Sequence, residues 1–357
     1  MNILFVGIRG NEQEITSAPK KISNALYNRM SKTHDNVYFF GLPWEGDKPV
    51  EDDDHVMVGE LTKLGGFIKE KKIDVVYFSR YYTKIALYLL LIKPIYRFKL
   101  IYTVHGIIKK EKVINNTFKY YSVLIEERLL KACDRIITVS DGLKEELLKF
   151  YPNLYKSRVE VIFNGVSVNP VEEYVDIRKL YSIEKNRKIL FTTGTRKIKN
   201  NEILINSILE NEKLKASTFL IIAGPLDTEY GIMLEDKYSN EANIKFTGEL
   251  RVDLINNIYS QMDLYIQISS FETFGMAIVE ALLHKKNVLL SERLPIASYF
   301  TEQEVSLWNP ADDLWVAIAE SLQTRGEVNE SGYEKAAEIF NWDTITEKYY
   351  KTFTGVL

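Results

Sequence analysis

The chain has 357 residues, of which 46% are hydrophobic and 27% are charged, and its formal net charge is −3. Such a length predicts about two domains, and the balanced composition excludes intrinsically disordered and fibrous proteins. The most apolar stretch, residues 85–92, falls far short of the ~20 residues that span a bilayer, which excludes an integral membrane protein.

The first predicted strand starts almost at the N-terminus, where a signal peptide would instead show a basic segment, an apolar run and a cleavage site. Cys133 is the single cysteine, so no intramolecular disulfide can form. Together these observations predict a cytoplasmic protein.

Short β-rich runs alternate with amphipathic segments along the first half. The predicted strands are Ile3–Gly7, Val37–Gly41, Val75–Ser79, Leu100–Val104, Arg135–Val139 and Val159–Phe163. The predicted helices include Pro19–Met30, Leu61–Lys71, Thr83–Ile92, Tyr120–Ala132 and Gly142–Phe150. Strands without in/out alternation, separated by helices, indicate a parallel sheet buried on both faces.

The same pattern begins again after a linker near Asn164–Asp176. Strands are predicted at Ile189–Thr193, Phe219–Ala223, Ile244–Phe246, Leu264–Ile268 and Val288–Leu290, and the chain ends in helices Asp312–Leu322, Tyr333–Ile339 and Asp343–Phe353. The fold class is therefore α/β, with two Rossmann-like, doubly wound domains. We expect the carboxyl ends of both sheets to line a central cleft, where ligands bind such folds.

The strongest chemical signal is the segment Ser270–Ala281, which directly follows a predicted strand. The start of its helix, around Thr273, Phe274, Gly275 and Met276, offers free backbone N–H groups to an anion, and the glycine allows a phosphate to approach closely. Glu272 precedes the helix, and we place Glu280 about two turns into it, ~12 Å further along the axis. This layout suits a diphosphate with a polyol at each end.

Glu280 has apolar neighbours on both sides in the sequence, which predicts a helix buried nearly all round. A buried carboxylate needs a partner, and ribose hydroxyls would provide one. An arginine elsewhere in the chain, or water at a helix edge, would serve as well, and the spacing alone leaves these alternatives open.

The Glu272-x7-Glu280 spacing resembles the signature of retaining glycosyltransferases with the GT-B fold, family four of the usual classification. Six further segments resemble that family in order and spacing: Thr103–Gly106, Asp134–Ser140, Val161–Val166, Ile222–Pro225, Phe246–Glu249 and Asn341–Asp343. The resemblance implies an acceptor-side domain (1–165), a nucleotide-sugar donor domain (166–340) and a C-terminal helix (341–357) that crosses back to the first domain.

The resemblance also implies roles for single residues. Glu272 would hold hydroxyls of the transferred hexose, and Arg196 and Lys199 would neutralise the diphosphate, with Lys197 as the substitute if the loop is shifted by one position. His105 would donate to a sugar hydroxyl or carry charge near pH 7. The backbone at Glu249 and Leu250 would contact the base. Without the resemblance, the cations fit a solvated basic loop, which is common, and a histidine at this place is more often a structural residue.

Three departures from the family pattern affect the site. Ser17-Ala18 stands where the family has a Gly-Gly turn, so backbone freedom is lost there. The loop Gly194–Asn200 is shorter by one or two residues, and 292–296 replaces a Gly-Gly-x-Pro-Glu segment. The last change predicts a different closure of the site.

Neither a metal nor a cofactor is implied, because Asp52-Asp53-Asp54 lies in an acidic loop and is interpreted as solvated surface. The predicted partners are a nucleotide-sugar donor and a glycan, glycolipid or protein acceptor, with no nucleic acid. The nucleotide stays open among UDP, GDP and ADP. Two other functions remain as alternatives: a nucleotide-sugar 2-epimerase of the same fold, and a non-enzymatic two-domain sugar-binding protein.

Charge is distributed unevenly along the chain. Residues 61–160 carry 20 Lys and Arg against 10 Asp and Glu, interleaved with aromatic and aliphatic residues. This pattern predicts an acceptor at an anionic surface such as the inner face of the cell membrane, in glycolipid or cell-surface glycan synthesis. The opposing interpretation is an ordinary packed helix at Thr83–Ile92 with solvated lysines around it.

Overall fold

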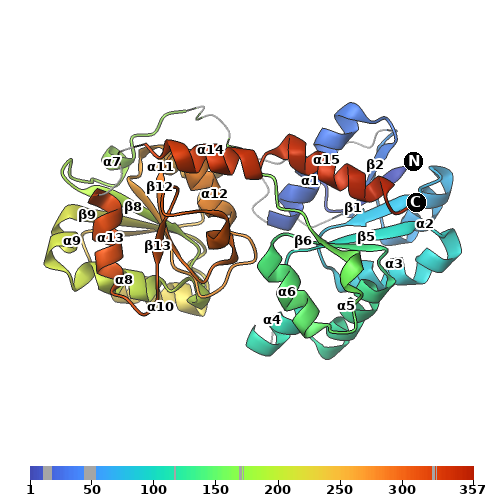
Figure 1. The fold of residues 1–357 in the computed structure, drawn as a ribbon, viewed down its shortest axis with the longest axis horizontal. Coiled ribbons are helices and arrows are strands. Elements are labelled where there is room, and N and C mark those ends of the chain that lie inside the picture. The colour runs from blue at the N-terminus through green and yellow to red at the C-terminus, as the bar shows by residue number, and fades with distance from the viewer. Residues whose placement is uncertain are drawn as a thin grey trace. The chain divides into compact units, whose positions relative to one another are not determined.

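The computed structural model describes residues 1–10, 18–43, 54–115, 118–168, 171, 173–323, 326 and 328–357. The chain forms two compact units, one of Met1–Gly165 with Trp342–Leu357 and one of Val166–Asn341. Each unit has one parallel sheet covered by helices (Figure 1). The prediction of two Rossmann-like α/β domains is therefore confirmed.

The first unit contains a seven-stranded sheet in the order β3-β2-β1-β4-β5-β6-β7. The strands are β1 (Ile3–Gly7), β2 (Val37–Gly41), β3 (Val56–Val58), β4 (Val75–Phe78), β5 (Lys99–Val104), β6 (Arg135–Thr138) and β7 (Val159–Val161). The chain proceeds outward from β1 in one direction and then from β4 in the other. The strand order thus reverses between these two neighbours.

The helices of the first unit connect these strands. They are α1 (Ala18–Thr33), α2 (Leu64–Glu70), α3 (Thr83–Tyr96), α4 (Ile108–Asn115), α5 (Tyr120–Ala132), α6 (Asp141–Phe150) and α15 (Trp342–Thr354). Helix α15 is last in the chain, yet its fully buried Tyr349 and Phe353 pack edge-on against Tyr77 and Phe5 of the sheet. The core of the first unit is therefore completed by the end of the chain.

The second unit has a six-stranded parallel sheet in the order β10-β9-β8-β11-β12-β13. Its strands are β8 (Lys188–Thr193), β9 (Thr218–Ala223), β10 (Ile244–Gly248), β11 (Leu264–Gln267), β12 (Asn287–Ser291) and β13 (Ser306–Trp308). The strand order reverses between β8 and β11, which pair side by side. Ligands of open α/β sheets bind at the carboxyl ends of the strands at this point.

The helices of the second unit are α7 (Ile177–Leu180), α8 (Asn201–Leu209), α9 (Glu212–Ser217), α10 (Glu229–Tyr238), α11 (Val252–Gln261), α12 (Met276–Leu283), α13 (Leu314–Gln323) and α14 (Glu330–Ile339). One sheet face carries an aliphatic core shared with α8, α10 and α13. The other carries aromatic contacts among Phe191, Tyr259 and Tyr265, whose ring centroids lie 5.3 to 6.0 Å apart.

The predicted strands are found within a residue or two of their expected ends. The edge strands β3 and β13 were not predicted, because three residues are too few to show a pattern. Helix α3 was expected to stop at Ile92 but continues through Pro94 to Tyr96, where Arg97 adopts a left-handed conformation and ends it. Helix α4 was not predicted, because it is short and half of its eight residues are lysine or glutamate.

Two sequence predictions fall on parts of the chain outside the described residues. Ser17 of the expected Ser17-Ala18 turn is one, and Ala18 itself begins α1. Asp52 and Asp53 of the acidic loop are likewise not described. In the described parts of the chain, none of the helices combines the length and apolar character that crossing a bilayer requires.

Candidate active site

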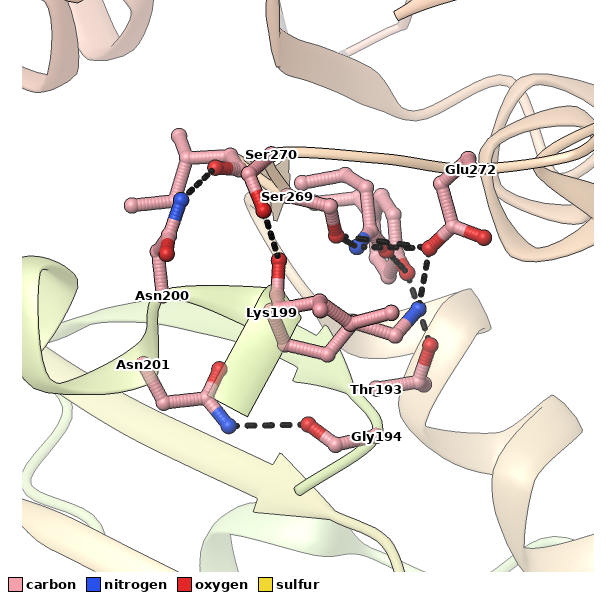
Figure 2. Close-up of polar contacts among 12 residues, drawn as sticks. Thr193, Gly194, Lys199, Asn200, Asn201, Ser269, Ser270 and Glu272 are labelled. Carbon is pink, nitrogen blue, oxygen red and sulfur yellow. Dashed lines mark hydrogen bonds and ion pairs between the residues drawn. The ribbon is translucent and has the colours of Figure 1, made fainter. Parts of the chain in front are cut away.

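Two loops of the second unit follow the strands at which its sheet order reverses. The loop after β8 runs through Gly194 to Asn200, and the loop after β11 runs from Ile268 to Gly275. They are tied together, because Asn200 Nδ2 donates to the Ile268 carbonyl at 2.9 Å and the Ser270 backbone N–H donates to Ile198 at 2.9 Å (Figure 2). The site is thus built on two loops that hold each other.

Gly194 determines where Lys199 lies. Its φ of +90° is left-handed, and a Cβ there would lie 2.7 Å from Cε of Lys199. Any larger residue would therefore displace the lysine stem as well as strain the backbone. Asn201 Nδ2 fixes the turn by donating to the Gly194 carbonyl at 2.8 Å.

Glu272 receives Lys199 across the gap between the two loops. The lysine ammonium is paired with Oε1 of the carboxylate, and both side chains are nearly buried, at 11% and 13% exposed. Gln267 Nε2 and Ser269 Oγ also donate to Oε1, each at 3.3 Å. Oε2 receives no hydrogen bond from the described residues and points away from this cluster (Figure 2).

A line of buried polar groups continues beneath Glu272. Tyr265 donates its hydroxyl to Gln267 Oε1 at 2.7 Å, and Thr193 Oγ1 lies 2.8 Å from the same tyrosine oxygen. Gln267 Nε2 also donates to Ser269 Oγ. The line connects the end of β8 with Glu272 through the interior of the sheet.

The helix that follows begins later than the sequence pattern suggested. Helix α12 starts at Met276, with Gly275 as its N-cap at a φ of +98°. Glu280 is therefore about one turn into the helix and not two. The expected separation of ~12 Å from Glu272 was counted along a helix axis, and residues 272–275 are not helical. Phe274 is buried against Phe340, with ring centroids 5.4 Å apart, so its ring is not accessible to a ligand.

Glu280 lies on a half-exposed side of α12, not on a helix buried nearly all round. Ile278, Val279, Ala281 and Leu282 are buried, but Glu280 is not. Its Oε2 accepts a hydrogen bond from Tyr259 at 3.3 Å. Burial, and to a lesser extent this carboxylate, holds the pKa of the Tyr259 hydroxyl well above its usual range, so the tyrosine stays a donor.

His284 lies beside this pair. Its ring stacks on Tyr259 with centroids 5.3 Å apart. Burial lowers the pKa of its imidazole to about 4, helped by Lys286, so the ring is neutral at pH 7.

The remaining predicted donor residues differ in exposure. Arg196 and Lys197 are exposed on the loop after β8, whereas Lys199 reaches Glu272. Glu249 is exposed and Leu250 half-buried just after β10, where Gly248 has a φ of +70°. The structure therefore brings Lys199 and Glu272 together but shows no such contact for Arg196.

His105 belongs to the first unit, where it follows β5. Its Nε2 is buried, without a hydrogen-bond partner among the described residues. Burial lowers the pKa of the imidazole to about 3, so the ring is neutral at pH 7. The predicted alternative in which His105 carries charge near pH 7 was wrong. A neutral imidazole still has a nitrogen donor to offer a hydroxyl.

A second buried carboxylate, Glu126 of α5, lies in the same unit. Its Oε1 accepts the Ile108 backbone N–H at 2.9 Å, and its Oε2 accepts the Lys109 N–H at 3.1 Å and the hydroxyl of Tyr151. It thereby caps the start of α4, the helix that follows His105. Burial raises the pKa of the carboxyl to about 7 against these hydrogen bonds, which lower it.

Sequence reasoning missed Gln267, Tyr265 and Glu126. Gln267 had a usable signal, because it is the one polar residue in the buried run Leu264–Ile268. Glu126 had none, since it stands among charged residues on a helix and its partners lie 17 to 25 residues away. In the described parts of the chain, no group of three or more His, Cys, Asp or Glu residues is arranged to hold a metal ion.

Each of the two units matches a protein-family model. Residues 44–169 match the model described as Glycosyltransferase Family 4, and residues 175–335 match Glycosyl transferases group 1. The chain carries the two domains of a GT-B glycosyltransferase. The pair at Lys199 and Glu272 lies within the second matched segment.

The curated relatives that the chain matches are distant in sequence. An uncharacterized glycosyltransferase of Methanocaldococcus jannaschii is 26% identical over 236 residues, which are 60% of this chain and 58% of that protein. The chain thus spans less than two thirds of that relative's length.

Solved structures agree in fold over the whole chain. Sucrose-phosphate synthase from Thermosynechococcus elongatus superposes with a TM-score of 0.79 at 15% identity, covering 100% of this chain and 99% of the other. The Anabaena protein HepE, solved with UDP-glucose, gives a TM-score of 0.74 at 18% identity, covering 99% and 100%. These likenesses show the GT-B fold.

Proposed function

We propose that the protein transfers a sugar from a nucleoside diphosphate sugar to an acceptor hydroxyl, with retention of the anomeric configuration. The observation that carries the proposal is the Lys199–Glu272 pair at the point where the sheet order reverses. The pair lies beside the N-terminus of α12. Its lysine is a cation that can bind a diphosphate, and its glutamate is a carboxylate that can bind sugar hydroxyls. The glycosyltransferase family models and the UDP-glucose bound to HepE support it.

In the proposed step, the acceptor oxygen attacks the anomeric carbon on the face from which the diphosphate leaves. The bond from that carbon to the diphosphate oxygen breaks, and the hydroxyl proton passes to a phosphate oxygen. The products are the glycoside and the free nucleoside diphosphate. Catalysis then consists of positioning and charge stabilisation, with no covalent intermediate on the protein.

Each group has one task in this proposal. Lys199, with Arg196 at the loop rim, stabilises the charge that develops on the leaving diphosphate. The start of α12 at Gly275 and Met276, with Thr273 and the Phe274 backbone before it, adds N–H groups to the phosphates.

The ends of the donor are held by other residues. Glu272 holds hexose hydroxyls, Glu280 holds ribose hydroxyls, and the backbone at Glu249 and Leu250 contacts the base. His105, neutral and with a buried ring nitrogen, donates to a sugar hydroxyl from the first unit.

A panel of UDP-, GDP- and ADP-sugars tests the activity. We expect one of them to raise the melting temperature and to be hydrolysed slowly without an acceptor. NMR of a transferred product should show the donor's anomeric configuration. Inverted product contradicts retention, and a 2-epimer formed without acceptor indicates an epimerase. Binding without any turnover identifies a sugar-binding protein.

For the acceptor, we propose a lipid-linked or cell-surface glycan that the first unit meets at an anionic membrane. Leu87, Leu91 and Ile95 of α3 are 45%, 61% and 69% exposed and repeat every four residues on one side of the helix. Tyr120 and Tyr121 of the adjoining α5 are 69% and 52% exposed. These five residues form what we call the α3–α5 patch.

The cations around the α3–α5 patch are fewer than the sequence count suggested. Lys93 is bound to Asp134 at 2.8 Å and Lys110 to Glu146. Exposed cations at the patch are Lys84, Arg97 and Lys119. Shallow insertion of the apolar stripe, with these charges on lipid phosphates, is the contact we propose.

Sedimentation with phosphatidylglycerol vesicles tests this contact. Binding should fall with salt, and Leu91→Ser with Ile95→Ser should weaken it, whereas Ile232→Ser, a matched exposed site at 49% in the second unit, should not. Failure of the wild type to pellet at low salt would leave a soluble acceptor.

A further inference from the structure

The polar line beneath Glu272 has a direction. The Tyr265 hydroxyl donates its hydrogen bond to Gln267 Oε1. Thr193 Oγ1 is therefore the donor in the hydrogen bond to the tyrosine oxygen. The Nε2 amide of Gln267 then donates two hydrogen bonds, one to Ser269 Oγ and one to Glu272 Oε1. Each group in the line therefore donates to the next one toward Glu272, and the line ends at Oε1 of that carboxylate.

The cost of this arrangement argues that it serves Glu272. Gln267 and Tyr265 are 2% and 0% exposed, in a strand whose other residues are apolar. A buried amide or hydroxyl is unfavourable unless its hydrogen bonds are made. All three polar hydrogens and acceptors of the Gln267 amide are engaged, and aligned chains of this kind polarise one another.

The line selects between the two carboxylate oxygens. Lys199, Gln267 and Ser269 all bind Oε1, and the described residues give Oε2 no donor. Three donors on one oxygen fix the torsion of the carboxylate, which leaves the other oxygen aimed at one place.

We propose that Gln267, oriented by Tyr265, is a positioning residue that locks Glu272 Oε1 so that Oε2 is presented to hydroxyls of the transferred sugar. This rests on the proposed function of Glu272. It adds that the geometry of that carboxylate is set from inside the sheet, and not by the lysine alone. A carboxylate displaced by an ångström loses most of its catalytic effect.

Gln267→Met tests the proposal, because it keeps the length of the side chain and removes both ends of the amide. With whichever of UDP-, GDP- or ADP-glucose is turned over, we expect kcat to fall about tenfold or more. The Kd of the free nucleoside diphosphate should stay within twofold, since the phosphate and ribose contacts are untouched. Tyr265→Phe should lower kcat about threefold, because Gln267 can still donate to Glu272.

Tyr238→Phe is the matched control. Tyr238 is also buried, at 5% exposed, and donates to an amide oxygen, that of Asn206, at 2.8 Å on the α8–α10 side of the same unit. It should leave kcat unchanged. If Gln267→Met melts like the wild type and keeps kcat within twofold, the proposal is wrong. It is equally wrong if nucleoside diphosphate affinity falls in parallel with kcat, since that marks general distortion.

Glu272→Ala separates this proposal from the proposed function. If that variant retains transfer, the function assigned to Glu272 fails and the positioning role fails with it. If it is inactive while Gln267→Met is fully active, only the positioning role fails. As a readout without turnover, Gln267→Met should weaken binding of the nucleotide sugar relative to the free nucleotide, but should have no such effect in a Glu272→Ala background.

Discussion

Glu272 and Glu126 are both removed from water and both hydrogen-bonded, yet they are partnered in opposite ways. Glu126 fills both oxygens with backbone N–H groups and a tyrosine hydroxyl. Glu272 concentrates three side-chain donors on Oε1. Both oxygens of the first carboxylate already accept hydrogen bonds, whereas Oε2 of the second accepts none from the described residues. Burial alone does not separate a structural carboxylate from a functional one, whereas the distribution of its partners does.

Replacing each carboxylate gives the sharpest test of this contrast. Glu272→Ala should reduce transfer about a thousandfold and leave affinity for the nucleoside diphosphate nearly unchanged, because it removes contacts to the reacting sugar. Steady-state rates and calorimetry measure the two. If Glu272→Ala keeps a transfer rate within threefold of the wild type, Glu272 is a structural carboxylate like Glu126.

For Glu126 we expect an effect on the pH dependence of the free energy of unfolding instead. Its folded pKa of about 7 exceeds the ordinary value of 4.5, so the folded state holds the proton more tightly. The stability that the group contributes is thus fully present below pH 4.5 and is lost as pH rises through 7. Linkage gives a loss of roughly 3 kcal/mol across this window.

Urea unfolding at pH 5 and pH 8 measures this loss, with Glu126→Gln as the comparison. The variant should lack that part of the pH dependence, while His105 and His284 titrate alike in both proteins. Identical pH profiles would mean that Glu126 stays ionised in the folded state.

Glu280 lies between the two cases, because Tyr259 binds one oxygen of a half-exposed carboxylate. Glu280→Gln should weaken binding of the free nucleoside diphosphate about tenfold, since a charged acceptor to ribose hydroxyls is lost. Glu202→Gln, on the surface of α8, is the control and should leave calorimetric affinity unchanged. Equal affinities for all three proteins would remove Glu280 from the site.

The smallest effect concerns the two loop cations. Arg196→Ala should lower transfer by a few fold and Lys199→Ala by more, because only Lys199 reaches Glu272. If both act on one diphosphate, the loss of transfer in the double variant should be about threefold smaller than the product of the two single losses. Lys213→Ala, exposed on α9, serves as the control. Strict additivity would assign the two cations to different groups.

The sequence predicted the two parallel sheets because their central strands are continuous apolar runs. It indicated Glu272 because a helix start follows such a run there, and Lys199 because its loop resembles that of the glycosyltransferase family. It could not predict the pairing of Lys199 with Glu272, 73 residues apart. Nor could it predict the late start of α12, which depends on Gly275 adopting a left-handed conformation. Glu126 escaped because its role depends on Ile108, Lys109 and Tyr151 meeting in three dimensions.

Helix α15 has a bearing on how the protein is made. Domains usually fold in the order in which they leave the ribosome. Here the second unit is complete once Asn341 has emerged, whereas the first unit still lacks Tyr349 and Phe353 from its aromatic core. The unit synthesised first is therefore finished last. Until then Phe5 and Tyr77 of its sheet lack the rings that cover them in the folded protein.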